Sequence, residues 1–259
     1  MTAPRRRLAV RARLAVAPVV GLTVFFGLWE GLVRGLGVKA FVMPPPSHIV
    51  RSLADRPGFF AREGIVTARE ALAGLALAFV VALALAVPMA RRKAVERAVQ
   101  PVALFVQLIP LVCYAPAFVI WMRPGFRPIA AVSALFALLP LLYNLTAGLK
   151  AADPDTVDVL RSAGASSGEI LRHVEIPSAM PYLFAGLRTA VGLALIGAVL
   201  GEWFALRSHG LGRQIQKGIA GGGATLIWSS AFALAVVGGL ALVLLAVGER
   251  ALAPAHGRT

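Results

Sequence analysis

Four ionisable residues lie within or beside long apolar runs of this 259-residue chain: Glu30, Glu70, Arg188 and Glu202. A charged side chain in hydrocarbon costs at least about 2.5–3.5 kcal/mol, so each needs a partner, a wet cavity or a place at the membrane interface. Glu70 and Arg188 are candidates for lining a polar pathway. The alternative is that Glu70 lies near the outer end of its helix and that Arg188 extends its guanidinium toward the inner interface.

Further candidates for such a pathway lie in the third and fourth apolar runs. Amide and hydroxyl side chains there could bond a polar solute, and they could equally pair helices with one another. A proline in a membrane helix produces a kink, which serves simple packing as readily as it shapes a pathway. Both interpretations stay open for Gln107, Pro110, Tyr114 and Asn144.

The sequence offers no common catalytic or nucleotide site in the structural context that such a site requires. No G-x-x-x-x-G-K-[ST] segment occurs, so the chain has no recognisable phosphate loop with which to bind ATP. The one G-x-S-x-G match, Gly164–Gly168, lies in a polar segment between two helical runs and not at the strand-to-helix turn of a nucleophile elbow. No histidine pair shares a helix face as a metal site requires. The single cysteine, Cys113, can form neither a disulfide within one chain nor a cysteine metal site. We therefore expect no enzyme activity, no cofactor and no metal.

The composition places the chain in a membrane. Hydrophobic residues make up 58% of it, whereas an ordinary soluble domain has about 45–50%. The formal net charge of +14 would suggest a nucleic-acid partner in a soluble protein. Here the basic residues cluster beside the apolar runs, where they favour the cytoplasmic side and anionic lipid headgroups. We expect contact with membrane lipid and none with nucleic acid.

Apolar runs of about 20 residues predict an all-α integral membrane protein with six transmembrane helices. Basic segments before the first run and at Arg91–Arg97 predict that both termini are cytoplasmic. One transmembrane domain is expected at 14–247, between a basic N-terminal tail at 1–13 and a C-terminal tail at 248–259. The helices are predicted at Leu14–Leu32, Ile65–Ala90, Ala98–Met122, Pro128–Leu149, Tyr182–Phe204 and Ala224–Val247.

A segment between the fourth and fifth predicted helices, Asp153–Pro181, is too polar to cross a membrane. Gly164 lies between two short runs of helical spacing, where the absence of a Cβ permits a tight turn. Pro177 is expected to end the second run. We expect a helix-turn-helix with one apolar face that a partner outside the bilayer can hold. The apolar residues are Leu160, Ala163, Ile170, Leu171 and Val174.

This segment resembles the cytoplasmic loop of permease subunits from bacterial binding-protein-dependent ABC importers. The pattern of that loop is Glu-Ala-Ala, three residues, Gly, nine residues, Ile, one residue and Leu-Pro. In this chain the matching residues are Asp158, Val159 and Leu160, then Gly164, Val174 and Ile176-Pro177. Three more segments resemble the sulfonate, nitrate and pyrimidine-precursor branch of these permeases: Met43–Ser47, Gly201–Trp203 and Gly210–Gly212. The resemblance extends from Leu14 to Val247.

The resemblance implies a permease subunit in a bacterial inner or plasma membrane. Its implied partners are a soluble solute-binding protein outside, a dimer of ATPase subunits that use ATP inside, and a second copy of this chain. The coupling loop, residues 150–181, would transmit motion from the ATPases. Ala165, Ser166, Ile170 and Leu171 are expected to enter the ATPase groove, with Glu169 and Arg172 at its rim. The expected coupling residues are completed by Asp158, Gly164, Val174 and Pro177.

Two other classes of protein remain as alternatives at this stage. A secondary carrier driven by an ion gradient would show charged relays in several helices, and often a repeated half. An integral-membrane enzyme would show a His/Asp/Glu constellation at one membrane face. The sequence shows neither feature. It also leaves open which solute is carried, with a sulfonate, taurine, nitrate or a pyrimidine precursor as the candidates.

Overall fold

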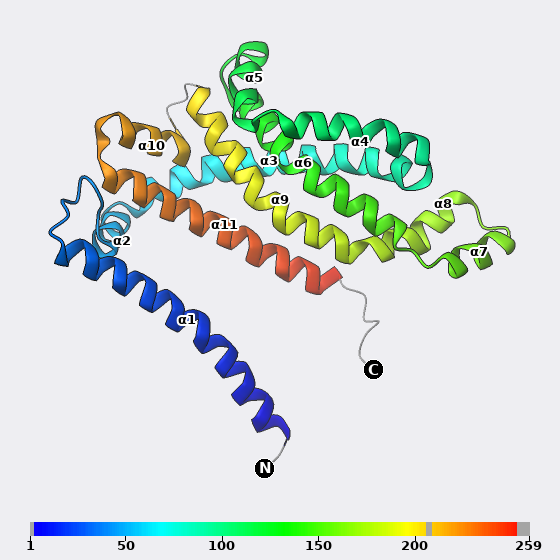
Figure 1. Cartoon of the computed structure of the whole chain (residues 1–259), viewed down its shortest axis with the longest axis horizontal. Helices are drawn as coiled ribbons and strands as arrows, with labels where there is room; N and C mark the ends of the chain where they lie inside the picture. The colour runs from blue at the N-terminus through cyan, green and yellow to red at the C-terminus, as the bar shows by residue number, and fades with distance from the viewer. Residues whose placement is uncertain (1–2, 206–208, 253–259) are drawn as a thin grey trace. The chain divides into compact units, whose positions relative to one another are not determined.

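The computed structural model describes residues 3–205 and 209–252, and in this part of the chain the regular secondary structure is all helical, without a β-strand. Figure 1 shows the helices in chain order. Their bounds are α1 Ala3–Gly35, α2 Pro46–Asp55, α3 Pro57–Arg91, α4 Lys93–Leu108, α5 Tyr114–Met122, α6 Phe126–Lys150, α7 Pro154–Ser162, α8 Ser167–Ile170, α9 Ile176–Phe204, α10 Leu211–Lys217 and α11 Ala224–Leu252. Three short helical turns join them, η1 Leu111–Cys113, η2 Leu171–Glu175 and η3 Gly218–Gly222.

Within the described residues, five helical stretches are long and apolar enough to cross a membrane. A sixth is obtained if α4 and the following stretch Leu111–Met122 are one broken span, bent by 84°. The sequence predicted one span at Ala98–Met122, and the structure shows that this span is broken at Ile109–Pro110. Pro110 explains the break because a proline drives the residue before it out of the helical conformation, and Ile109 is extended, at φ −74° and ψ 126°.

The remaining predicted spans are helices in the structure, and each extends beyond its predicted bounds at one end or at both. Helix α3 begins eight residues before Ile65, and α9 begins six residues before Tyr182. Helix α1 includes most of the predicted N-terminal tail. The predicted C-terminal tail is helical up to Leu252, and its last seven residues lie outside the described part of the chain.

The chain divides into two compact units, one of residues 1–59 and 214–232, the other of residues 60–213 and 233–259. The larger unit is organised around α6 and α9, which lie side by side (Figure 1). Glycines allow this close approach, because a Cβ at Gly197 would lie 2.7 Å from Ser133 Cα, and one at Gly201 would lie 2.9 Å from Ile129 Cα. Small residues at a helix contact are a common means of association inside a membrane.

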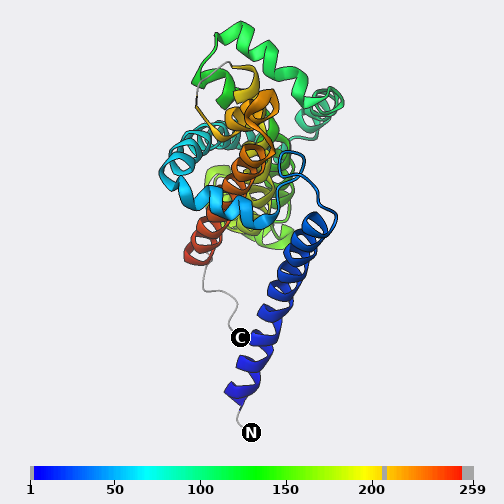
Figure 2. The same ribbon diagram turned by 90° about the vertical axis from the view of Figure 1, so that its left-hand side faces the viewer.

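The smaller unit has an aromatic core at the C-terminal end of α1. Trp29 packs edge-on against Trp228 of α11, with ring centroids 4.9 Å apart, and Phe232 and Ile49 join the same cluster. Both views show α2 folded back beside this end of α1 (Figures 1 and 2). Glu30 fixes the turn, since its carboxylate accepts from Ser47 N at 3.0 Å and from Ser47 Oγ at 2.8 Å.

Candidate functional site

Helix α7 is the first helix of the coupling loop, and Asp153 is its N-cap residue. The Asp153 carboxylate accepts from the Thr156 hydroxyl at 2.6 Å and from the Thr156 and Asp155 amides at 3.2 and 3.4 Å. It thereby satisfies amides that a helix leaves without an intrahelical partner. Hydrogen bonds from the side chain and then the amide of Thr156 hold the pKa of Asp153 below its ordinary value of 3.8.

The turn after α7 depends on Gly164, as the sequence predicts. Gly164 has φ +84°, in the left-handed region that side chains with a Cβ disfavour. The next amide, Ala165 N, donates to Leu160 O at 3.0 Å, and Gly164 N donates to Arg161 O at 3.1 Å. These bonds satisfy the last carbonyls of α7, so the glycine ends one helix and redirects the chain into the next.

Helix α8 begins with a reciprocal cap. Glu169 N donates to Ser166 Oγ at 3.3 Å, and Ser166 N donates to Glu169 Oε2 at 2.7 Å. Arg91, at the end of α3, connects the start of α8 with α3. Its guanidinium donates to Ser167 O at 2.7 Å and pairs with Glu175 at 3.1 Å. The loop is thus attached firmly to a transmembrane helix that is distant in sequence.

The second helical run of the loop does not end at Pro177, contrary to the prediction. The π-helical turn η2 joins α8 to α9, and Pro177 is the second residue of α9. A local π-helical turn accommodates a proline, which has no N–H to donate, within a continuous helical stretch. Residues Ser167–Phe204 therefore form one helical stretch from the loop into the membrane span. Any displacement of α8 would be carried directly into α9.

Exposure separates the expected coupling residues into two groups. Ile170 is only 5% exposed, and Leu171 packs against the core of the larger unit, so neither is presented to an external groove as expected. These two side chains anchor the loop to the larger unit instead. Val174 and Ala165 are half-buried. The exposed members are Asp158, Gly164, Ser166, Glu169, Arg172 and Pro177, with Val159 beside them.

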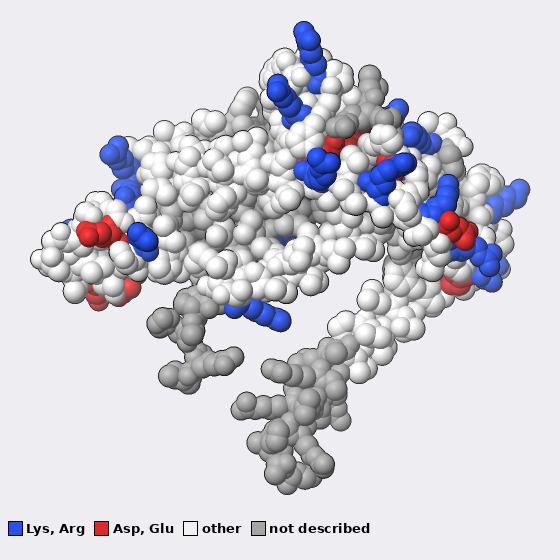
Figure 3. Space-filling view, turned by 180° about the vertical axis from the view of Figure 1, so that it is seen from behind, with Lys and Arg blue, Asp and Glu red and all other residues white. Residues whose placement is uncertain are grey.

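The coupling loop carries exposed side chains of both charges. Figure 3 shows acidic and basic side chains together over α7 and α8, whereas the flank of the long helices on the same face is mostly uncharged. The Arg161 guanidinium pairs with Asp158 at 2.8 Å within α7. The loop therefore offers a charged, water-exposed surface, and the flank offers one suited to lipid.

A second polar feature, which the sequence analysis missed in part, lies inside the larger unit. We call Glu63, Thr67, Glu70 and Glu202 the carboxylate cluster. The first three lie on one face of α3 at intervals of four and three residues, and all four are at most 1% exposed. That spacing is readable in the sequence. Only Glu70 and Glu202 were singled out there.

The carboxylate cluster holds the segment Gly210–Arg213 against α3 and α9. Its contacts are Gly210 N to Glu63 Oε2 at 2.6 Å, Leu211 N to Thr67 Oγ1 at 2.8 Å, Arg213 N to Glu202 Oε2 at 3.1 Å and Thr67 Oγ1 to Glu202 Oε1 at 2.6 Å. A buried carboxylate that accepts several amides is stabilised there.

Two glycines allow this segment to approach Glu202. Gly210 has φ +112°, and a Cβ on it would overlap the carboxyl group of Glu202. A Cβ on Gly212 would lie 2.8 Å from Glu202 Oε2 and equally close to the backbone of Val199. Glycine is therefore required at both positions, because a Cβ at either would crowd the Glu202 carboxyl group.

The six candidate pathway residues do not form one site. Gln107 and Pro110 are exposed at the break between α4 and η1, and Tyr114 donates across that break to Val106 O at 3.2 Å. Asn144 donates to Pro140 O at 2.8 Å, at the contact of α6 with Gly186 of α9.

The two charged pathway candidates also lie apart. Glu70 belongs to the carboxylate cluster, where it bonds to Glu202. Arg188 pairs with Glu249 of α11, and its side chain is 53% exposed. Both residues have partners, which is one of the three conditions expected for charges beside apolar runs.

This arrangement defines a multi-pass helical membrane protein with a charged loop continuous with one span. Residues 74–256 match the model of the family described as binding-protein-dependent transport system inner membrane component. The chain belongs to this family. It is therefore a permease subunit of an ABC importer, and not an ion-gradient carrier.

Relatives that match most of the chain are named as transport permeases. A formylaminopyrimidine transport permease protein of Halalkalibacterium halodurans is 30% identical over 248 residues, covering 94% of this chain and 97% of the relative. A riboflavin transport system permease protein of Chloroflexus aurantiacus is 32% identical, covering 77% and 76%. The MetNI methionine ABC transporter in an inward-facing conformation has a similar fold, with a TM-score of 0.64 and 18% identity, over 76% of this chain and 97% of that one.

Proposed function

We propose that two copies of this chain form a pathway through a bacterial inner or plasma membrane for a small polar solute. A soluble binding protein delivers the solute from outside. Two ATPase subunits dock from inside, and they alone bind and hydrolyse ATP. The continuity of α8, η2 and α9 carries the proposal, because it connects a charged exposed loop to a membrane span without an intervening break.

The proposed ATPase contact is the exposed surface formed by Val159, Gly164, Ser166, Glu169 and Arg172. Val159 supplies apolar area, since it is 68% exposed, and the charged side chains surround it. Ile170 and Leu171 act from below by anchoring the loop on the larger unit. A push on the exposed surface is then transmitted to α9 through the anchored residues.

Changing Gly164 to Val tests the coupling directly. A β-branched residue cannot readily adopt φ +84°, so the turn and the exposed surface should be distorted while the spans remain intact. We expect ATP hydrolysis without solute uptake in proteoliposomes that contain the complete complex. Gly168→Val is the matched control, because Gly168 has ordinary backbone angles and a Cβ added there would meet nothing within 4 Å. Undiminished uptake by the Gly164 variant would contradict the proposal.

Orientation is tested by a thiol at Ser167, which is exposed in the loop. The proposal requires both termini and the coupling loop to be cytoplasmic. Cys113 is also exposed and must first be replaced by Ser. A membrane-impermeant maleimide should then label Ser167→Cys in inside-out vesicles only. Labelling in intact cells would place the loop outside and overturn the mechanism.

The solute belongs in one of the sulfonate, nitrate, taurine or pyrimidine-precursor classes. Similarity to the formylaminopyrimidine permease over nearly the whole chain supports testing pyrimidine precursors first. A calorimetric binding screen on the cognate soluble binding protein identifies the solute. Uptake by this chain in liposomes without ATPase subunits would contradict the division of labour proposed here.

A further inference from the structure

A cavity of about 310 Å³ lies in the smaller unit, between α2 and the start of α11. Its lining residues are His48, Arg51, Ser52, Asp55, Arg56 and Thr225. None of them belongs to the coupling loop, the carboxylate cluster or the pathway candidates. The volume lies at the lower end of the range of small-molecule sites, about 300–1,000 Å³.

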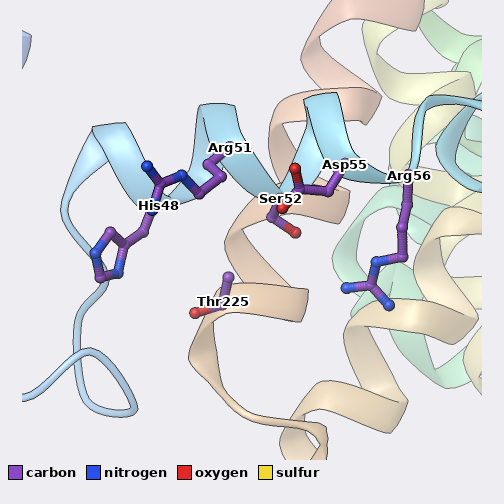
Figure 4. Close-up of a pocket in the computed structure, with 6 residues that line it drawn as sticks. All are labelled: His48, Arg51, Ser52, Asp55, Arg56 and Thr225. Atoms are coloured by element: carbon purple, nitrogen blue, oxygen red, sulfur yellow. The ribbon is translucent and has the colours of Figure 1, made fainter.

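Positive charge exceeds negative charge in this cavity. Arg51 and Arg56 each contribute one positive charge, and Asp55 contributes one negative charge. Figure 4 shows His48 and Arg51 at one end and Asp55 and Arg56 toward the other. The Arg56 guanidinium lies 5.7 Å from the centroid of the Phe59 ring, a contact that restrains it.

Ser52 provides an independent sign of a ligand. It is 9% exposed, and its hydroxyl has no hydrogen-bond partner among the described residues. Figure 4 shows its side chain between α2 and Thr225. A buried polar group without a partner is uncommon, and it calls for an explanation such as a ligand.

One more hydroxyl, outside the cavity lining, lies on α11 close to Thr225. Ser229 lies one helical turn after Thr225 and therefore on the same helix face. Ser229 is fully buried, and its Oγ also has no hydrogen-bond partner within the described chain. Hydroxyl donors and guanidinium groups together suit a ligand with several acceptor oxygens.

We propose that this cavity binds an oxyanionic group, such as a sulfate, sulfonate, carboxylate or phosphate group. Arg51 and Arg56 supply the charge, and Ser52 and Thr225 supply hydroxyl donors. Asp55 weakens the binding of anions and so limits the affinity. The position of the cavity on the outer face of the membrane rests on the orientation in the proposed function, whereas the chemistry of the cavity does not.

The test measures equilibrium binding of radiolabelled sulfate to the purified full-length chain in dodecyl maltoside. We expect saturable binding that weakens about tenfold in Arg51→Gln and in Arg56→Gln, as loss of a charge-assisted bond predicts. Asp55→Asn should bind sulfate more tightly. Arg127→Gln is the control, because Arg127 is an exposed arginine at the start of α6 in the larger unit and is not one of the residues that line the cavity. Sulfate binding that persists in an Arg51→Gln/Arg56→Gln double variant would overturn the proposal, as would equal weakening in the control.

Ser52→Ala separates binding from folding. Removing a buried hydroxyl that has no partner should leave the melting temperature unchanged or higher. Sulfate binding should nevertheless weaken. Unchanged sulfate affinity in this variant would exclude Ser52 from the site and contradict the proposal.

A second experiment distinguishes a soluble anion from a lipid phosphate as the ligand. Sulfate binding that survives transfer into phosphatidylglycerol nanodiscs assigns the cavity to a soluble anion. Binding that is lost there, and regained in detergent, assigns it to a lipid phosphate. Either result supports an oxyanion site. These assays need neither ATPase subunits nor uptake, so their failure is independent of any failure of the importer mechanism.

Discussion

The coupling loop and the carboxylate cluster both redirect the chain of the larger unit, and they do so by opposite means. The loop uses neighbours in sequence, since Asp153 bonds residues two and three positions later and Ser166 pairs with Glu169. The cluster uses Glu63 and Thr67 to hold amides more than 140 residues away. The first set is exposed and the second is buried.

This difference separates a part that can move from a part that is fixed. Exposed local caps compete with water and contribute little each, so a loop built from them can respond to a partner. Buried polar bonds are costly to leave unmade, so a segment held by them stays in place. Disrupting each region in turn measures how large the difference is.

The largest effect is expected from Glu202→Ala. Loss of this side chain leaves the Thr67 hydroxyl and the Arg213 amide without their buried acceptor. The cost should be about 3 kcal/mol of unfolding free energy. Thermal denaturation in detergent, followed by the loss of the monodisperse species, provides the measurement.

Glu249→Ala is the control for that prediction. Glu249 pairs with the half-exposed Arg188, and such a pair contributes about 0–1 kcal/mol. A melting temperature lowered equally by both substitutions would mean that burial does not distinguish the two glutamates. The comparison between fixed and movable regions would then fail.

The next effect is expected from Gly210→Ala. The substitution combines a disfavoured φ of +112° with overlap of the Glu202 carboxyl group. We expect a loss of about 2–3 kcal/mol from strain and crowding together. In a Glu202→Ala background the overlap is removed, so the added cost should fall to the strain alone. Melting of the four proteins of this double-mutant cycle gives the coupling, and additive losses would contradict it.

A smaller effect is expected in the loop from Gly164→Ala. The cost is that of an L-residue in a left-handed turn, about 1–2 kcal/mol, because nothing lies within 4 Å of a Cβ there. Hydrogen exchange at Ala165, whose amide bonds to Leu160 O, reports it locally. Gly168→Ala should leave exchange at Ala165 unchanged or slower. Global unfolding in the Gly164 variant would show that the loop is not separable from the core.

The loop was more predictable from the sequence than the cluster for the same physical reason. Gly164 could be assigned because its turn depends on residues within five positions of it. The role of Glu202 depends on Thr67 and Arg213, which no local pattern connects with it. The spans followed from apolar length alone. The break at Pro110 depended on the extended conformation of Ile109, and the passage of the helix through Pro177 depended on the π-helical turn before it. Exposure of Ile170 could not be judged without its tertiary contacts.

The smallest effect is the pH response of the α7 cap. The pKa of Asp153 is lowered in the folded protein, chiefly by the Thr156 hydroxyl, so its contribution is fully present above its ordinary value of 3.8. That contribution is lost only as the pH falls through the lowered folded value. Amide exchange at Thr156, divided by that in Asp153→Asn, should stay constant at neutral pH and rise below about pH 3.8. The asparagine cancels the intrinsic pH dependence of exchange and also caps helices well. A rise that begins near neutral pH would assign the titration to another group and remove Asp153 from its place as the local cap.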